Sequence, residues 1–550
     1  MSLDRRQFAA AALGVAVSGS GRAQSVRRPN VILVLTDDQG YGDLSIHGNP
    51  YLKTPHTDAI GRQGVQFTQF QVSPVCSPTR SSLLTGRYNY RTGVVDTFLG
   101  RSMMYPDEVT VAQLLADKGY RTGIFGKWHL GDNYPMRACD RGFQESVVHR
   151  GGGIGQPADP EGNSYFDPIL DHNGRQKKYS GYCTDVFFDA ALEWVETGGS
   201  QPFFSYIAPN APHAPLTVGD EWSGPFRKMG LPEDVSKVYG MVANIDQNLG
   251  KLHKKLQALN IERDTLLIFM TDNGPAGQTN RFNAGMRATK GTVYQGGIRV
   301  PFFMKWAGRL QPRKTDRIAA HIDVLPTILD ACNIPKPKGL QLDGVSIMPL
   351  ASGTAKAWPG RTLFTQWHRG DVPEPFRASA VRTQRYKLID GKELYDMQAD
   401  PAEARDIAAA NPEIVTRLRK EYTDWFDSVS AVRKYVPPRI YLGTPHENPV
   451  TLTRQDWRVP PDTQRAVGWW EVDVRRAGNF QVGVRFQPVD AAATVHFELS
   501  GVQRTAEVAP GANECLLPAV KLTAGPGQLR TAVSTGAKTE GATYVDVWLL

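Results

Sequence analysis

The fold of this chain is predicted from one stretch, Pro74-Val-Cys-Ser-Pro-Thr-Arg-Ser-Ser-Leu-Leu-Thr-Gly-Arg87. Within it Cys76 stands two residues before a proline and four before Arg80, and a helix is expected to begin at Ser81-Ser82. The pattern Cys-x-Pro-x-Arg arises by chance in many chains, but Thr-Gly-Arg at a fixed offset makes it far more specific. A buried free cysteine beside a helix is the structural alternative.

Length and composition limit the class of protein. A chain of 550 residues is too long for one compact core and is expected to form two or three domains. The 41% of hydrophobic and 21% of charged residues are typical of a globular protein. The net charge of +8 suits an anionic substrate, but no basic block stands out, so nucleic acid is not an expected partner.

Residues 1–23 have the pattern of an export signal. Asp4-Arg-Arg-Gln-Phe8 precedes a run of small apolar residues, with cleavage expected after Ala23, which is typical of a twin-arginine signal. A plain secretory leader is the alternative. The sequence therefore predicts a periplasmic or secreted protein. No apolar run is long enough for a stable membrane anchor.

Hard oxygen ligands follow two apolar runs. Residues 31–35 lead into Thr36-Asp37-Asp38, and residues 266–270 lead into Thr271-Asp272-Asn273. Such runs indicate strands buried on both faces of a parallel sheet, whose carboxyl edge is where open α/β sheets build their sites. Carboxylate and amide oxygens favour calcium or magnesium over zinc. The expected ligands are Asp37, Asp38, Asp272 and Asn273.

Cationic groups follow two further expected strands. Thr110 and Gln113 are spaced as a capping box for a helix over residues 108–118, and a strand over 122–125 then leads to Lys127 and His129. Another strand, over 203–207, leads to His213 in a proline-rich loop.

A glycine-rich segment supplies one more cation. Lys290 is followed by glycines at 291, 296 and 297, which would permit an anion to approach the backbone closely. On its own this pattern would mean little.

Taken together, these motifs resemble those of the type I, formylglycine-dependent sulfatases, which are arylsulfatase-like members of the alkaline phosphatase-like superfamily. The resemblance covers residues from about 28 to 429. It implies an α/β fold with a mixed sheet sandwiched by helices. It also implies that a formylglycine-generating enzyme converts Cys76 to an aldehyde, before export if the leader is of the twin-arginine type. Thr79 stands where the family often has serine, a mild departure.

The resemblance also implies residue roles and one calcium ion. The implied metal site comprises Asp37, Asp38, Cys76, Asp272 and Asn273. The implied catalytic residues are Cys76, Arg80, Lys127, His129, His213 and Lys290.

The implied reaction is the hydrolysis of a sulfate monoester to an alcohol and inorganic sulfate. One hydroxyl of the hydrated aldehyde would attack sulfur while Lys127, Lys290 and calcium hold the sulfate oxygens. His213 and Lys290 would protonate or stabilise the leaving oxygen. His129 would then deprotonate the second hydroxyl, which releases sulfate and restores the aldehyde.

Three domains are expected after the leader. Residues 28–350 would form the catalytic α/β domain, and residues 351–435 a small antiparallel sheet with one helix over 412–429. Residues 440–550 alternate with a period of two and predict a β-sandwich. This module would either stabilise the protein or bind glycan through exposed tryptophans, such as Trp457, Trp469 or Trp470.

One loop of the small subdomain is a candidate substrate contact. Its aromatic and charged residues could grip a sugar next to the scissile sulfate, although a structural loop is the alternative. They are Trp367, His368, Arg369 and Asp371.

Two other functions stay open at this point. A phosphodiester or phosphonate monoester hydrolase of the same superfamily also uses a modified cysteine, but those enzymes tend to have Asp-His in place of Asp272-Asn273 and to lack Lys-x-His. A non-catalytic, glycan-binding homologue would require lost catalytic residues, and none is lost. A sulfated carbohydrate is the preferred substrate, with a small sulfated molecule as the alternative.

Overall fold

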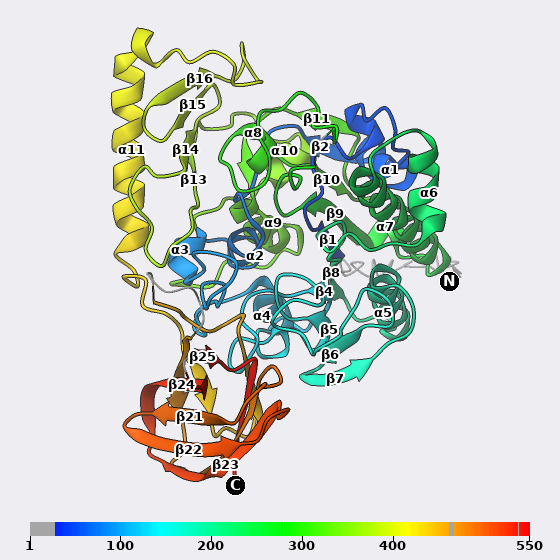
Figure 1. Cartoon of the computed structure of the whole chain (residues 1–550). Coiled ribbons are helices and arrows are strands. Elements are labelled where there is room, and N and C mark those ends of the chain that lie inside the picture. The colour runs from blue at the N-terminus through cyan, green and yellow to red at the C-terminus, as the bar shows by residue number, and fades with distance from the viewer. Residues whose placement is uncertain (1–27, 279, 461–466, 537) are drawn as a thin grey trace, which may run out of the picture.

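The structure is a computed structural model that describes residues 28–550 except 279, 461–466 and 537. The predicted export signal, residues 1–23, lies outside the described residues. Figure 1 shows a large α/β domain, a small subdomain with a long helix at its edge, and a β-rich module at the C-terminus. Among the described residues, no helix is both long and apolar enough to cross a membrane.

The α/β domain is built on a ten-stranded mixed sheet in the order β11-β2-β10-β9-β1-β8-β4-β5-β6-β7. The four strands expected to carry chemistry are neighbours at its centre and run parallel. They are β9 (Thr265–Thr271), β1 (Asn30–Thr36), β8 (Phe203–Ala208) and β4 (Arg121–Lys127). The others are β2 (Val65–Phe67), β5 (Glu145–His149), β6 (Ile169–His172), β7 (Arg175–Lys178), β10 (Phe302–Lys305) and β11 (Arg313–Thr315).

Helices cover both faces of this sheet, as predicted. Along β1, Val31, Leu33 and Leu35 pack in the core on one face. Ile32 and Val34 pack in the core on the other. The first face is covered by α2 (Cys76–Thr85), α4 (Val111–Ala116) and α9 (Val324–Ala331), and the second by α1 (Pro55–Gln63), α5 (Cys183–Thr197) and α7 (Glu233–Ala258). Shorter helices are α3 (Asn89–Thr92), α6 (Asp220–Lys228), α8 (Gln295–Ile298) and α10 (Met348–Ser352).

Two predicted helix boundaries were wrong. The helix expected over residues 108–118 is α4, which covers only Val111–Ala116 because Thr110 is its N-cap and accepts a hydrogen bond from the Gln113 backbone. The helix expected from Ser81 is α2, which already begins at Cys76. Pro78 lies in its first turn, where a missing N–H costs nothing.

The small subdomain has the expected form. An antiparallel sheet in the order β13-β14-β15-β16 packs against α11 (Pro412–Ser430) through Leu388, Leu418 and Tyr422. The strands are β13 (Leu363–Gln366), β14 (Ser379–Arg382), β15 (Tyr386–Ile389) and β16 (Glu393–Asp396). A short pair, β3 (Phe70–Gln71) and β12 (Ala319–Ala320), lies within the α/β domain.

The C-terminal module consists of two sheets around one core, which agrees with the predicted sandwich. One sheet has the order β17-β19-β24-β21-β22 with β25 beside β24, and the other has the order β18-β26-β20-β23. The strands are β17 (Ile440–Leu442), β18 (Val450–Thr453), β19 (Trp469–Val474), β20 (Gly478–Arg485), β21 (Ala493–Leu499), β22 (Val502–Val508), β23 (Glu514–Leu522), β24 (Gly525–Thr535), β25 (Lys538–Gly541) and β26 (Tyr544–Leu549).

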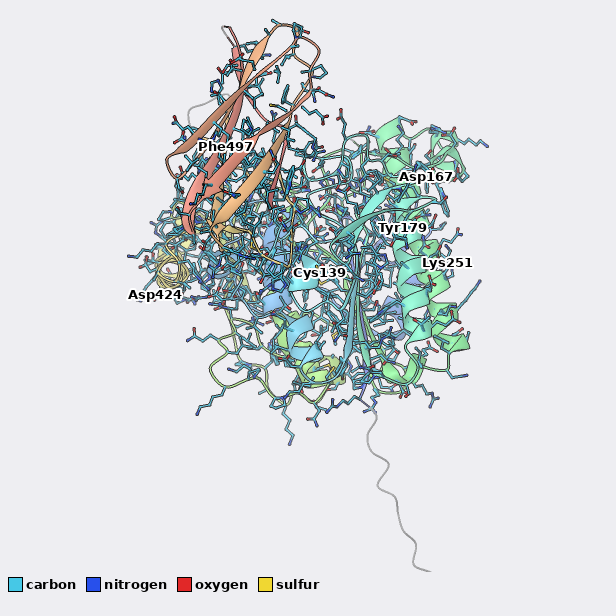
Figure 2. The ribbon with its side chains drawn as sticks, turned by 90° about the horizontal axis from the view of Figure 1, so that it is seen from below. Cys139, Asp167, Tyr179, Lys251, Asp424 and Phe497 are labelled. Carbon is cyan, nitrogen blue, oxygen red and sulfur yellow. The ribbon has the colours of Figure 1, made fainter. Side chains whose placement is uncertain are left out.

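The module is not the separate body that the sequence suggested. Leu99, Met103 and Met136 of the α/β domain belong to the module's own hydrophobic core. Figure 2, where Phe497 marks the module and Asp424 marks α11, shows both packed on the α/β domain. Of the three tryptophans considered for glycan binding, Trp457 and Trp470 are buried, so only Trp469 is partly exposed.

Candidate active site

The candidate catalytic residues meet at the carboxyl ends of the four central strands. The register of β1 and β9 aligns Thr36 with Thr271, so Asp37 and Asp272 leave the sheet side by side. Lys127 is the last residue of β4, and its Nζ donates to Asp37 Oδ2 at 2.6 Å. The structure therefore brings together side chains that lie up to 252 positions apart in the chain.

Cys76 is the first residue of α2 and is buried. The turn before it is closed by Thr79, whose Oγ1 accepts a hydrogen bond from the Ser73 backbone at 3.0 Å. A serine hydroxyl could accept the same bond, so threonine at position 79 fits the motif. Burial raises the pKa of the Cys76 thiol, which disfavours a thiolate.

Three buried carboxylates stand beside Cys76, each paired with one cation. Asp37 pairs with Lys127, Arg80 Nη2 lies 2.8 Å from Asp272 Oδ2, and Lys290 Nζ lies 2.5 Å from Asp38 Oδ1. Burial and the nearby Asp37 raise the pKa of Asp272 to about 6. Burial acts to raise the pKa of Asp38, but Lys290, His213 and Asn273 together outweigh it and hold that pKa well below its usual range.

These residues fit a hard divalent cation. Asp37, Cys76 and Asp272 each offer a ligand atom, and the three atoms lie within 4.8 Å of one another. Among the described residues, nothing hydrogen-bonds to Asp37 Oδ1 or Asn273 Oδ1, although both atoms are buried. Unpaired buried oxygens are costly unless something coordinates them. Oxygen ligands of this kind suit calcium.

The charges of the site would favour an anion once a divalent cation is bound. Three carboxylates and three basic side chains cancel, and the two nearby histidines are neutral because burial lowers their pKa values, that of His213 to about 4. A bound divalent cation would leave a net positive charge of about two, which would attract a sulfate group.

His129 is held in one tautomer. Its Nε2 lies 2.6 Å from the Thr97 carbonyl oxygen, which can only accept, so Nε2 carries the proton. The unprotonated Nδ1 then faces Cys76 Sγ at 3.5 Å. The ring is therefore placed to accept a proton from a group at residue 76.

His213 faces the metal ligands from the loop after β8. Its Nδ1 donates to the Ala214 carbonyl at 2.6 Å, and its Nε2 lies 3.8 Å from Asp38 Oδ2. Pro212 and Pro215 flank this segment and restrict its backbone.

Glycines allow close backbone packing next to Lys290. A Cβ at Gly274 would lie 1.8 Å from the Gly296 carbonyl, and a Cβ at Gly297 would lie 2.1 Å from the Thr292 carbonyl. These glycines let the Lys290 segment pack tightly on the end of β9 and so help to position the lysine.

The loop after β13 lies beside this site. A Cβ added at Gly291 would be 3.4 Å from the Trp367 ring, so Trp367 is a neighbour of the Lys290 segment. Trp367 Nε1 and Arg369 Nη1 both donate to the buried carboxylate of Asp96, at 3.0 and 2.8 Å. The Arg369 side chain is nevertheless 53% exposed and can contact a ligand.

Two other residues of this loop, which were also expected to contact substrate, make contacts within the protein. Both ring nitrogens of His368 bond to the backbone of its own loop, at Arg369 and Glu374. Asp371 pairs with Arg101 and Arg458.

Two residues near His129 were not predicted from the sequence. Thr97 supplies the carbonyl that fixes the imidazole, and Gln455 of the C-terminal module lies 3.4 Å from His129 Nε2. Neither belongs to a recognisable motif, so no sequence signal indicated them.

Comparison with known families agrees with the fold and the site. The family model described as Sulfatase matches residues 29–334, and the model described as N-sulphoglucosamine sulphohydrolase, C-terminal, matches residues 288–426. Because the first match covers more than half of the 550 residues, the chain belongs to the sulfatase family, in the alkaline phosphatase-like superfamily.

Individual relatives support this assignment. Arylsulfatase A of Homo sapiens is 30% identical over 492 residues, covering 80% of this chain and 89% of that protein. The N-acetylgalactosamine-6-O-sulfatase of Bacteroides thetaiotaomicron is 26% identical over 481 residues, covering 72% and 92%. The crystal structure of Ps i-CgsB in complex with k-i-k-neocarrahexaose has a TM-score of 0.67 at 27% identity, covering 72% of this chain and 92% of that one.

The chain is therefore a sulfuric ester hydrolase, as predicted. This assignment favours a sulfate ester over a phosphodiester or a phosphonate monoester as the substrate.

Proposed function

We propose that this sulfatase removes sulfate from a carbohydrate, using a formylglycine made from Cys76 and one calcium ion. The observation that carries the proposal is the placement of Cys76. It is buried at the start of α2, close to the carboxylates of Asp37 and Asp272 and to the unprotonated Nδ1 of His129.

The ligand set supports calcium. Asp37, Asp38, Asp272 and Asn273 would hold the ion, and when bound it would polarise a sulfate oxygen and an oxygen of residue 76. Arg80 supports this arrangement because it fixes Asp272 through two nitrogens and also donates to the Lys127 carbonyl at 3.0 Å.

The raised pKa of the Cys76 thiol argues against a thiolate nucleophile, which supports modification of this residue. Formylglycine, once installed, supplies a hydroxyl nucleophile and can afterwards return to the aldehyde. His129 Nδ1 accepts the proton given up at residue 76 when sulfate is released.

The remaining residues act on sulfate charge and on the leaving group. Lys127 and Lys290 neutralise the sulfate oxygens. Asp38 raises the pKa of Lys290 against the opposing effect of burial, so this lysine stays charged and can donate a hydrogen bond to the leaving oxygen. His213 faces the same region through Nε2.

A carbohydrate is the favoured substrate for two reasons. The Bacteroides relative is a sugar sulfatase by name, and the Ps i-CgsB structure contains a neocarrahexaose. Trp367 offers an aromatic ring beside the Lys290 segment, and Arg369 offers an exposed cation near it.

The cellular route is also part of the proposal. Residues 1–23 would direct export to the periplasm or beyond. Because twin-arginine export carries folded proteins, a formylglycine-generating enzyme would have to act on Cys76 in the cytoplasm.

The proposal is tested by mass spectrometry of the peptide containing Cys76, together with kinetics on 4-nitrophenyl sulfate and 4-nitrophenyl phosphate. We expect an aldehyde at residue 76 and a strong preference for the sulfate. Cys76→Ala should abolish turnover without unfolding the protein, because it removes only one buried sulfur. An intact cysteine in active enzyme would overturn the proposed chemistry.

A further inference from the structure

The proposed active site is completed by the C-terminal module. We propose that Gln455 is a positioning residue that holds the Thr97 carbonyl, and through it the imidazole of His129. This inference rests on the proposed role of His129 as the base at residue 76.

The side chain of Gln455 is buried between the module and the α/β domain, with 3% of the residue exposed. Its Nε2 donates to the Thr97 carbonyl at 2.8 Å and to Ser102 Oγ at 3.1 Å. The two hydrogens of the amide are thereby both used. Because the Thr97 oxygen can only accept, the NH₂ group of Gln455 has to face it.

The same carbonyl receives the Nε2–H of His129 at 2.6 Å. Gln455 Nε2 and His129 Nε2 lie 3.4 Å apart because both donate to this one oxygen. The orientation of the imidazole, with Nδ1 toward Cys76, therefore depends on where the Thr97 carbonyl is held. Gln455 supplies one of its anchors.

Gln455 is itself fixed from both sides of the domain boundary. The backbone N–H of Gly100 donates to the backbone carbonyl of Gln455 at 3.0 Å. The side chain of the next residue, Asp456, accepts from the backbone N–H of Asp132, also at 3.0 Å. Leu99 and Met103, which flank Gly100, pack in the module's core. Residues 97–102 thus connect the module to the catalytic base.

The test uses the full chain with Gln455→Met, which keeps the length of the side chain and removes the donor. We expect kcat on 4-nitrophenyl sulfate to fall roughly 10- to 100-fold, as is typical when a residue that orients a catalytic ligand is lost. KM should change less than about twofold, because Gln455 does not contact sulfate. The value of kcat is calculated per protein molecule that carries formylglycine at residue 76, and mass spectrometry measures this fraction.

Gln455→Glu is the second variant, since it places a carboxylate against the Thr97 carbonyl and should lower kcat at least as much. Gln528→Met is the matched control: Gln528 Nε2 donates to Glu471 Oε1 at 2.8 Å within the module, away from His129, and kcat should stay at the wild-type value. If Gln455→Met lowers only the melting temperature and leaves kcat unchanged, the role is merely structural and the inference is wrong. Absence of sulfate release by the wild type would instead overturn the proposed function, and this inference with it.

Discussion

Asp37, Asp38 and Asp272 concentrate three buried carboxylates in one site. Each pairs with one lysine or arginine, and Asp38 also faces His213 at 3.8 Å. A cation that binds the folded state but not the unfolded state raises the free energy of unfolding, by about 2.7 kcal/mol at a hundredfold excess over Kd. We therefore expect added Ca²⁺ to raise the melting temperature of protein purified without metal. Differential scanning calorimetry with and without Ca²⁺ measures this effect without depending on activity.

Asn273→Ala is the informative variant for this measurement. It removes a neutral oxygen ligand but leaves the three ion pairs intact, so the shift produced by Ca²⁺ should become smaller. An exposed carboxylate elsewhere, changed in Asp490→Asn, should leave the shift as in the wild type. A wild-type melting temperature that does not respond to Ca²⁺ would contradict the proposed metal site.

The convergence of the proposed metal ligands could be predicted from the sequence because they follow two buried strands, and parallel strands bring their carboxyl ends to one edge. The environment of His129 could not be predicted in this way. The carbonyl that fixes its tautomer comes from the backbone of Thr97, in an irregular segment. Because every residue type has a backbone carbonyl, the identity of residue 97 gives no indication of this contact.

The loop between β13 and β14 is the element that we expect to distinguish a sugar from a small aryl substrate. Arg369→Ala should raise KM for a sulfated oligosaccharide roughly tenfold, which corresponds to about 1.4 kcal/mol of binding free energy, because an exposed guanidinium is lost. KM for 4-nitrophenyl sulfate should stay nearly unchanged. Steady-state kinetics on both substrates measures the difference.

Arg377→Ala provides the control within the same loop, since Arg377 is also about half exposed and pairs only with the neighbouring Glu374 among the described residues. It should alter neither KM. If Arg369→Ala raises KM for both substrates equally, the loop supports the sulfate site in general and does not recognise the sugar.

The type of each helix or strand was predicted more reliably than its first and last residues. The central strands were expected within one or two residues, because a continuous apolar run ends where polar ligands begin. The helices α2 and α4 were misplaced at their starts, where Pro78 and Thr110 act through local backbone geometry and not through hydrophobic period.

At the scale of the whole molecule, the sequence predicted a β-sandwich but not its attachment. The alternation of apolar and polar residues in β20 and β21 shows only which side chains face the module's own core. The contact between Gln455 and His129 joins residues 326 positions apart, and it depends on how two folded bodies pack. No local pattern encodes that packing.

The same interface contains two buried carboxyl groups that make its stability depend on pH. Asp132 and Asp456 are almost completely buried on opposite sides of it. Burial raises the pKa of Asp456 to about 6, and burial together with Asp456 raises the pKa of Asp132 well above its usual value. An acid with a raised pKa binds more protons in the folded than in the unfolded state, so the free energy of unfolding falls as pH rises from about 4 through 6.

Asp456→Asn removes one of the two acids while its side-chain oxygen can still accept the Asp132 backbone N–H. At pH 8 the variant should therefore be more stable than the wild type, by on the order of 3 kcal/mol for a shift of about two pKa units. Near pH 4 the carboxyl is protonated in the fold and about half protonated in the unfolded chain, so most of the difference should disappear. Urea denaturation of both proteins between pH 4 and pH 8 measures it, with Asp490→Asn as the exposed control. A variant that is less stable than the wild type at pH 8 would contradict this prediction. It would show that Asp456 is ionised in the folded protein and is stabilised there by the charge of Arg150.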